Sequence, residues 1–381
     1  GKPPALRENP ALSKTMTAYL DYNATAPIRP EALDAMTAAL AEPGNASSVH
    51  GPGRRARRLI EEARARVAAL AGVDPAWVIF TSGGTEANNL ALGGLPANRI
   101  LVSAGEHDSV LQAAPEADRI ALTAEGRIDL DALAAALEDA AEGTLVSVML
   151  ANNETGVIQP LARVAALARA AGAWVHCDAV QAAGKIPLDG LARDADLVTL
   201  SAHKLGGPQG VGALLARPEL PLKALLQGGG QERRRRAGTE NLAGIAGFGA
   251  AAEMAHEDLA DFQKVAELRD SFEVNIKGLA PEIEIFGEAV PRLPNTSCVA
   301  VAGLPAETQL MALDLAGVAV SSGAACSSGK VQPSHVLTAM GASPEAAGSA
   351  IRVSLGWASR AEDIDRLLAA WGDLYRRSQA A

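Results

Sequence analysis

Between residues 77 and 201 the chain alternates short apolar runs with helical patterns, and this alternation constrains the fold more than any other feature. The strand candidates are residues 77–80, 99–103, 120–122, 144–150, 173–177 and 196–200. Helical spacing occupies residues 129–141 and 161–171 between them. Buried strands that alternate with helices form a mostly parallel sheet with helices on its faces. We therefore predict an α/β fold with a mostly parallel central sheet.

The remaining segments predict a second, smaller domain. A long helical stretch at residues 241–279 leads out of the α/β region, and short strands and helices follow it, as in a small α+β domain. We expect a large domain at residues 33–262 and a small domain at residues 263–381. Residues 16–32 form an arm associated with the small domain. Residues 1–15 lack periodicity and precede Met16, so we expect them to be an added or disordered leader.

Composition favours a protein that acts on small molecules. Of the 381 residues, 48% are hydrophobic, and the formal net charge is −10, so no overall basic field attracts nucleic acid or anionic lipid. No run approaches the roughly 18 apolar residues of a membrane span, and the N-terminal residues lack the charged-then-apolar pattern of a secretory signal. We expect a cytoplasmic protein without nucleic-acid or membrane partners.

The three cysteines, Cys177, Cys298 and Cys326, are odd in number and far apart, which argues against a disulfide framework and against paired-cysteine metal sites. Gly and Ser residues surround Cys326 at 321–330 and predict an exposed, mobile loop that carries a reachable thiol. Cys177, inside an apolar run, and Cys298 are interpreted as structural.

A lysine at the end of a predicted buried strand is a candidate for covalent catalysis. Lys204 follows the run at 196–200 and precedes a glycine-rich turn at 205–210. Partial desolvation there lowers the pKa of an ammonium group and favours imine chemistry, so Lys204 is a Schiff-base candidate. A solvated strand-end lysine is the alternative.

Two segments are candidates for anion binding. Residues 81–87, Thr-Ser-Gly-Gly-Thr-Glu-Ala, join a strand to a helix start, where free backbone N–H groups and the helix dipole attract a phosphate. A plain capped turn explains the same residues. The run Arg233-Arg234-Arg235-Arg236 is either a solvated loop or an anion contact offered to a second subunit.

Polar residues stand at the ends of successive predicted strands. They are Thr85, His107, Asn153, Asp178 and Lys204. Ligands of open parallel sheets bind beyond the carboxyl ends of the strands, so we expect these five side chains to converge on one crevice. Singly, each has an ordinary explanation as a cap, a turn or a loop residue.

A Schiff-base lysine, a phosphate site and a carboxylate for a pyridinium nitrogen are what a pyridoxal phosphate site requires. With these motifs the chain resembles the cysteine desulfurases of the NifS/IscS family, in the class V aminotransferase superfamily. The motifs are Asp21-Tyr22-Asn23-Ala24-Thr25, residues 81–86, Asn152-Asn153-Glu154-Thr155-Gly156, residues 176–181, Ser201-Ala202-His203-Lys204 and residues 321–326. The resemblance implies the aspartate aminotransferase-like, fold-type I architecture: a large domain that binds pyridoxal 5'-phosphate and a smaller α+β domain.

The resemblance also implies roles for the cofactor-binding residues. Lys204 would hold the cofactor and shuttle the α-proton of the substrate, Asp178 would pair with the pyridinium nitrogen, and His107 would stack on the ring. Asn153 and Gln181 would lie at the phenolic oxygen. The phosphate would be held by Gly84, Thr85, Ser201 and His203, joined by Thr239 from a second subunit.

For the substrate, L-cysteine, the resemblance implies that Arg352 grips the carboxylate, with Asn23 and Asn153 as further substrate-binding residues. Cys326 would take the sulfur as a persulfide for iron-sulfur cluster assembly, with a scaffold protein as acceptor of the sulfur and a homodimer as the active species. The loop between Cys326 and Pro333 and the short C-terminal segment favour a NifS-like enzyme. A selenocysteine lyase or another class V aminotransferase-like enzyme is the alternative, and a non-enzymatic scaffold subunit would lack Lys204 or Cys326.

Overall fold

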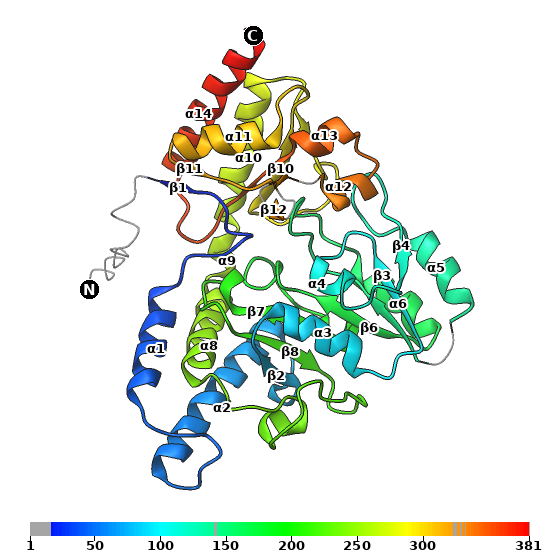
Figure 1. Ribbon diagram of the computed structural model, residues 1–381, viewed down its shortest axis with the longest axis vertical. Helices are drawn as coiled ribbons and strands as arrows, with labels where there is room; N and C mark the ends of the chain where they lie inside the picture. Colours follow the sequence, from blue (N-terminus) through cyan, green and yellow to red (C-terminus); the bar gives the residue numbers. More distant parts are fainter. Residues whose placement is uncertain (1–16, 141–142, 323–325, 328–329, 332, 381) are drawn as a thin grey trace.

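The computed structural model describes residues 17–140, 143–322, 326–327, 330–331 and 333–380, with the backbone alone at 326–327 and 330–331. Figure 1 shows two parts stacked along the long axis. The lower part contains the central sheet and the helices that cover it. The upper part holds the C-terminal helix α14 (Ala361–Gln379), and α10 (Lys264–Leu279) runs up into it.

The described central sheet has seven strands in the order β2-β8-β7-β6-β5-β3-β4. They are β2 (Val78–Thr81), β3 (Arg99–Ser103), β4 (Asp118–Ile120), β5 (Thr144–Ser147), β6 (Trp174–Asp178), β7 (Leu197–Ser201) and β8 (Gly212–Ala216). All run in one direction except β8, which is antiparallel to both of its neighbours. The predicted mostly parallel sheet is therefore confirmed. The sequence did not indicate β8, whose short connection to β7 leaves no room for the crossover that parallel pairing needs.

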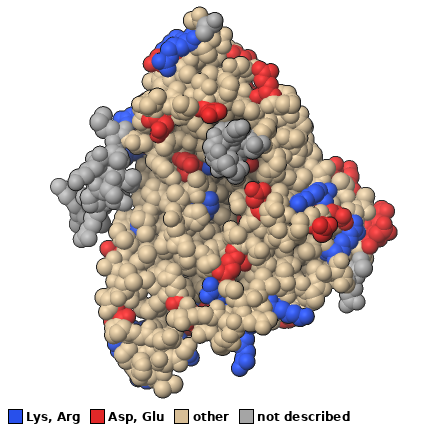
Figure 2. Space-filling view, in the orientation of Figure 1, with Lys and Arg blue, Asp and Glu red and all other residues tan. Residues whose placement is uncertain are grey.

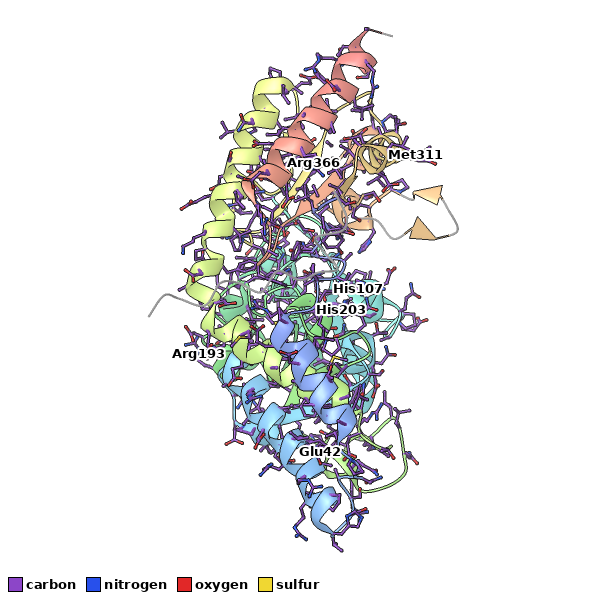
Figure 3. The ribbon with its side chains drawn as sticks, turned by 90° about the vertical axis from the view of Figure 1, so that its left-hand side faces the viewer. Glu42, His107, Arg193, His203, Met311 and Arg366 are labelled. Atoms are coloured by element: carbon purple, nitrogen blue, oxygen red, sulfur yellow. The ribbon has the colours of Figure 1, made fainter. Side chains whose placement is uncertain are left out.

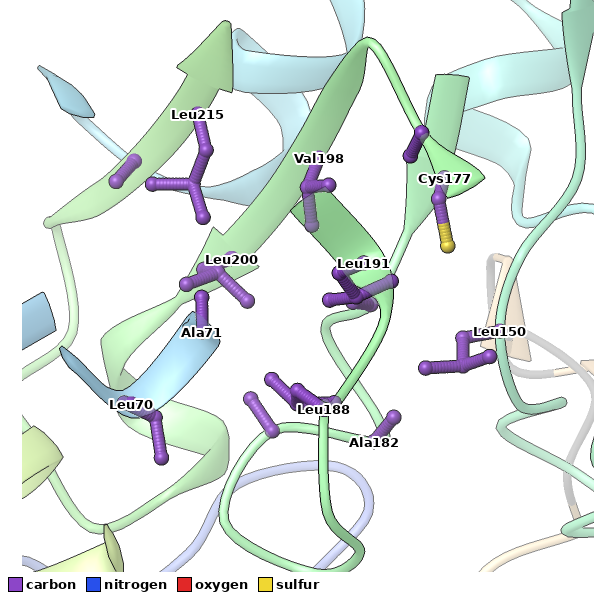
Figure 4. Packing of buried hydrophobic residues seen from close by; sticks show 14 of the residues in the cluster. Leu70, Ala71, Leu150, Cys177, Ala182, Leu188, Leu191, Val198, Leu200 and Leu215 are labelled. Carbon is purple, nitrogen blue, oxygen red and sulfur yellow. The ribbon is translucent and has the colours of Figure 1, made fainter. Parts of the chain in front are cut away.

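Helices cover both faces of this sheet. One face packs against α1 (Pro30–Ala41), α2 (Gly51–Ala71), α5 (Leu130–Glu138), α6 (Leu161–Ala170) and α8 (Leu242–Glu257), and the other against α3 (Gly84–Gly94) and α4 (Asp108–Leu111). Figure 4 shows the apolar layer on the first face, in which Val198 and Leu200 of β7 and Leu70 of α2 belong to one cluster of buried residues. Strands buried on both faces explain why the apolar runs in the sequence are continuous.

The smaller part has its own apolar core. A three-stranded antiparallel sheet is formed by β14 (Ile351–Ser354), β10 (Thr296–Ala300) and β9 (Glu284–Ile285), and it packs with α10, α11 (Ala306–Leu315) and α14. The arm joins this core, since β1 (Ala18–Tyr19) pairs with β11 (Val318–Ala319). The helices α12 (His335–Ala339) and α13 (Pro344–Ser349) form a satellite cluster. The domain boundaries given above stay a prediction.

The helical stretch predicted at residues 241–279 is three helices, α8, α9 (Leu259–Phe262) and α10. The chain changes cores here, because Phe248 of α8 is buried in the large core whereas Phe262 and Phe272 are buried in the small one. Residues 258–263 contain neither Gly nor Pro, so no local signal marks the break. Tertiary packing, not propensity, divides the stretch.

The segment predicted as a loop around Cys326 contains a short hairpin instead. β12 (Cys326–Ser327) pairs antiparallel with β13 (Lys330–Val331), and Figure 3 shows the two strands standing out from the body of the molecule. The thiol of Cys326, and with it the predicted exposure, lies outside the described residues. No helix in the described part of the chain is both long and apolar enough to cross a membrane.

Candidate active site

A cavity of about 560 Å³ lies where the central sheet meets the smaller part. The five strand-end residues predicted to converge all line it: Thr85, His107, Asn153, Asp178 and Lys204. The other predicted site residues in its wall are Asn23, Gly84, Gln181, Ser201, His203 and Arg352. Thr239 is exposed and is not among the described residues that line the cavity.

One end of the cavity is suited to an anion. Helix α3 begins at Gly84 directly after β2, so the unpaired N–H groups of its first turn face this end. A Cβ at Gly84 would lie 3.2 Å from Cγ2 of Val180 and 3.5 Å from Cβ of Ser201, so a larger residue would fill the space. Burial and then the charge of Lys204 lower the pKa of His203 to about 4, which leaves its ring neutral.

The carboxylate of Asp178 is fixed at the end of β6. Its Oδ1 accepts from the backbone N–H of Val180 at 3.0 Å, and its Oδ2 accepts from Nδ2 of Asn88 at 2.8 Å. Asn88 was not indicated by the sequence motifs, although it lies four residues after Gly84 and therefore on the same face of α3. Its own Oδ1 is buried and has no partner among the described residues.

The amine of Lys204 is held over the cavity by the N-terminal arm. Lys204 ends a short 3₁₀ turn after β7, and its Nζ donates to the carbonyl oxygens of Asn23 at 2.6 Å and Ala24 at 2.8 Å. Burial, and after it the Arg352 guanidinium, lowers the pKa of Lys204 to about 8. About a tenth of this amine is neutral at pH 7, far more than in a lysine with the usual pKa, and the neutral form is the nucleophile.

His107 is oriented by its own turn. It caps α4, and its Nδ1 accepts from the backbone N–H of Ser109 at 3.1 Å, so a neutral ring carries its proton on Nε2. Figure 3 shows His107 and His203 at the level between the two parts of the chain, and both line the cavity.

The turn after β5 exposes one asparagine to the cavity. Oδ1 of Asn152 accepts from the backbone N–H groups of Glu154 and Thr155, both at 2.9 Å, so Asn152 stabilises the turn. Asn153 is therefore not needed as a turn residue, and it lines the cavity.

Arg352 forms the opposite wall, and its side chain is 5% exposed. Its Nη2 donates to Oδ1 of Asp21 at 2.7 Å and its Nη1 to the carbonyl oxygen of Asn153 at 3.0 Å. Its Nε is buried without a partner in the described part of the chain. A buried donor without a partner is costly unless a ligand completes it.

The side chain of Asn23 is fully engaged within the protein. Its Nδ2 donates to Oγ1 of Thr296 and to the carbonyl of Asn153, and its Oδ1 accepts from Lys185 and Asn295. The substrate contact expected for Asn23 stays a prediction and would require one of these bonds to open.

Two of the three thiols are shielded from solvent. Burial, and then Asp178, raises the pKa of Cys177 well above its usual value, and burial raises the pKa of Cys298 in the same direction. Figure 4 shows the sulfur of Cys177 within the apolar layer that includes Leu150. Thiols of this kind are poor nucleophiles, so Cys326 remains the candidate.

The arginine run is engaged with its own chain. Arg233 donates to the carbonyl of Ala76, Arg235 to that of Pro218, and Arg236 pairs with Glu86 at 2.9 Å. On the face seen in Figure 2, basic and acidic side chains are interspersed and no basic patch gathers. The run therefore serves in part to tie its loop to α3, and the contact with a second subunit stays a prediction.

Comparison with known proteins agrees over nearly the whole chain. The family model described as aminotransferase class-V matches residues 18–367. A cysteine desulfurase of Cereibacter sphaeroides is 46% identical over 365 residues, which cover 92% of this chain and 93% of that protein. The solved NifS-like protein of Rickettsia africae superposes with a TM-score of 0.89 at 34% identity, covering 94% of this chain and 99% of that one.

A second similar structure is that of SspA in complex with cysteine, with a TM-score of 0.76, 28% identity, and coverage of 88% of this chain and 98% of that one. Both structures support the fold-type expected from the motifs. A match that spans residues 18–367, together with relatives of this identity, is conclusive: the chain belongs to the class V aminotransferase family.

Proposed function

We propose that this chain is a cysteine desulfurase that uses pyridoxal 5'-phosphate to convert L-cysteine to L-alanine and keeps the sulfur as a persulfide on Cys326. The observation that carries the proposal is the arrangement of Lys204, Asp178 and the Gly84 turn around one cavity. It is supported by the 46% identical relative named cysteine desulfurase and by the structure of SspA with cysteine.

The residues of the cavity fit this cofactor. The first turn of α3 and the space beside Gly84 suit its phosphate, with Thr85, Ser201 and His203 around them. The Asp178 carboxylate suits the pyridinium nitrogen, and the amine of Lys204 suits the aldehyde. Asn153 and Gln181 are assigned to the phenolic oxygen and His107 to the ring face.

When bound, pyridoxal phosphate withdraws electrons from the α-carbon of an amino acid. Asp178 keeps the ring nitrogen protonated, because an adjacent carboxylate favours the charged form. Lys204 would take the α-proton of the substrate, and its lowered pKa suits an acid-base group working near neutral pH.

Arg352 binds the carboxylate of the substrate. A guanidinium meets a carboxylate with two parallel N–H donors, and Nε is the donor that the described residues leave free. The contact of Nη2 with Asp21 holds the plane of the guanidinium, so the substrate is oriented by the same arm that holds Lys204.

The thiolate of Cys326 attacks Sγ of the bound cysteine. A sulfur–sulfur bond forms while the Cβ–Sγ bond breaks, and the electron pair of that bond stays with the substrate carbon, which takes a proton and leaves as alanine. The persulfide is then available to an acceptor, for which an iron-sulfur scaffold protein is the proposed partner. The proposal includes a cytoplasmic location.

The proposed active species is a homodimer in which Thr239 of one subunit completes the phosphate site of the other. The exposure of Thr239 on a loop tied down by the Arg236–Glu86 pair is compatible with this. Light scattering on the active protein tests it, and a fully active monomer contradicts it.

The decisive assay of the function is to incubate the purified protein, loaded with pyridoxal phosphate, with L-cysteine and a thiol reductant. The proposal predicts equal amounts of alanine and sulfide. A parallel incubation with L-selenocysteine separates the alternative, because a selenocysteine lyase releases alanine from that substrate alone. Absence of alanine from both substrates refutes the proposed function.

A further inference from the structure

A second lysine lies behind the cavity and takes no part in the mechanism above. Lys185 follows β6 at the end of a helical turn, is 3% exposed, and does not belong to the cavity wall. Its Nζ donates to Oε1 of Gln181 and to Oδ1 of Asn23, both at 2.8 Å. Within the described ranges, no carboxylate forms an ion pair with it.

The surroundings favour the neutral amine at this position. Burial, followed by the charges of Lys204 and Arg352, lowers the pKa of Lys185 well below its usual value. A neutral amine has two N–H groups, and the two amide oxygens accept them both. A buried lysine whose charged form is disfavoured in this way is suited to donating hydrogen bonds in a fixed geometry and not to binding an anion.

The two bonds fix the direction of the Gln181 amide. Turning the amide over would remove the oxygen that accepts from Lys185 and would place Oε1 against the carbonyl oxygen of Asn23, acceptor against acceptor, which is unfavourable in a buried site. Oε1 of Gln181 therefore keeps facing Lys185, on the side away from the cavity. Nε2 donates one N–H to the carbonyl oxygen of Asn23 at 2.9 Å, the same oxygen that accepts from Lys204 at 2.6 Å.

We propose that Lys185 is a positioning residue, which holds Gln181 so that the second N–H of its amide is presented to the phenolic oxygen of pyridoxal phosphate. This inference rests on the proposed function, because it requires the cofactor in the cavity. The buried amine of Lys185 would then determine where the N–H group of Gln181 points at the cofactor ring. The carbonyl oxygen of Asn23, which accepts from both Gln181 and Lys204, connects the two side chains.

The test is Lys185→Met, which keeps an unbranched side chain one atom shorter and removes both donors. A desolvated amine is replaced by an apolar chain there, so we expect the protein to fold. The dissociation constant of pyridoxal phosphate, measured by equilibrium dialysis on the cofactor-free protein, rises about tenfold. The matched control is Lys223→Met at an exposed site, for which we expect the wild-type value.

A double-mutant cycle with Gln181→Met separates positioning from general destabilisation. If Lys185 acts through Gln181, then adding Lys185→Met to Gln181→Met changes the dissociation constant little further. A structural role alone makes the two losses multiply, which overturns the inference. The visible absorption band of the bound cofactor should shift alike in both single variants, because both lose the same donor.

Lys185→Gln keeps two N–H donors without a charge. We expect its dissociation constant for pyridoxal phosphate to lie within about threefold of the wild-type value. If Lys185→Met does not fold, the result for Lys185→Gln is the test of the inference. A loss as large as that of Gln181→Met contradicts the inference. The proposed function and this inference can fail separately. If the wild-type protein makes alanine, but Lys185→Met leaves both the dissociation constant of pyridoxal phosphate and its absorption band unchanged, then the inference is overturned and the proposed function stands.

Discussion

Lys204 and Asp178 reach the cavity from the ends of two neighbouring strands of one sheet, whereas Arg352 reaches it from β14 in a different sheet. On the first wall both groups have their partners already: Lys204 donates to two carbonyls, and both oxygens of Asp178 accept. On the second wall Arg352 retains a buried Nε without a partner. The wall assigned to the cofactor is therefore already ordered by bonds within the protein. The wall assigned to the substrate has a donor that gains a partner only when the substrate binds.

This difference has a consequence for mutations. Changes on the sheet wall should act on the chemical step, since these groups would contact the cofactor in every state. Changes on the wall of Arg352 should act mainly on substrate affinity, since its free donor has a partner only when a substrate is bound.

Lys204→Ala should have the largest effect. Without the amine the protein neither links the cofactor nor transfers the α-proton, so alanine production falls to about a thousandth or less. The visible band of the lysine-bound cofactor should disappear from the absorption spectrum. Lys223→Ala is the control, and an unaltered spectrum in Lys204→Ala would remove Lys204 from its assigned role.

Asp178→Asn should lower kcat about a hundredfold with little loss of stability. The fold tolerates the change because Asn88 can turn its amide over, which directs its unpartnered Oδ1 at the new NH₂ group. Thermal unfolding and steady-state kinetics measure the two effects. Near-wild-type turnover would mean that Asp178 only caps the turn after β6.

Arg352→Lys should lower kcat/KM for L-cysteine about thirtyfold, mainly by raising KM. The ammonium keeps the charge beside Asp21 but lacks the planar pair of donors that a carboxylate meets. The comparison of the two walls is refuted here if kcat falls while KM stays constant, because Arg352 would then act on the chemical step.

The smallest effect concerns the pH dependence of cofactor binding. Only the neutral amine attacks the aldehyde, and the pKa of Lys204 is about 8. The rate at which the cofactor-free protein takes up pyridoxal phosphate should therefore rise about fivefold from pH 7 to pH 8, rise about twofold more to pH 9, and level off above pH 9. Stopped-flow absorbance measures the rate, and a rise that continues to pH 10 would indicate an unshifted lysine.

The same two walls show what the sequence could predict. The strand ends are local features: an apolar run followed by a polar residue identifies Asp178 and Lys204 without knowledge of their neighbours. The parallel sheet then brings them together, because parallel strands end at one edge. The fold class and the cavity wall on the sheet side follow from such patterns.

The residues that complete the site depend on contacts far apart in the sequence. Asn88 meets Asp178 across 90 positions, and Lys185 meets Asn23 across 162. Neither asparagine nor lysine carries a local pattern that predicts such a contact. The hydrogen bond between Asn23 and Thr296 also depends on tertiary packing, and so does the break between α8 and α10. No local pattern in the sequence predicts either of them.

The measurement that tests the central claim most directly is mass spectrometry of peptides after a single turnover with L-cysteine. Cys326 should carry one additional sulfur atom, while Cys177 and Cys298, whose thiols are buried, should carry none. Cys326→Ala should bind the cofactor and the substrate normally and release no alanine. Additional sulfur on Cys177 or Cys298, or alanine from Cys326→Ala, would contradict transfer of the sulfur to Cys326.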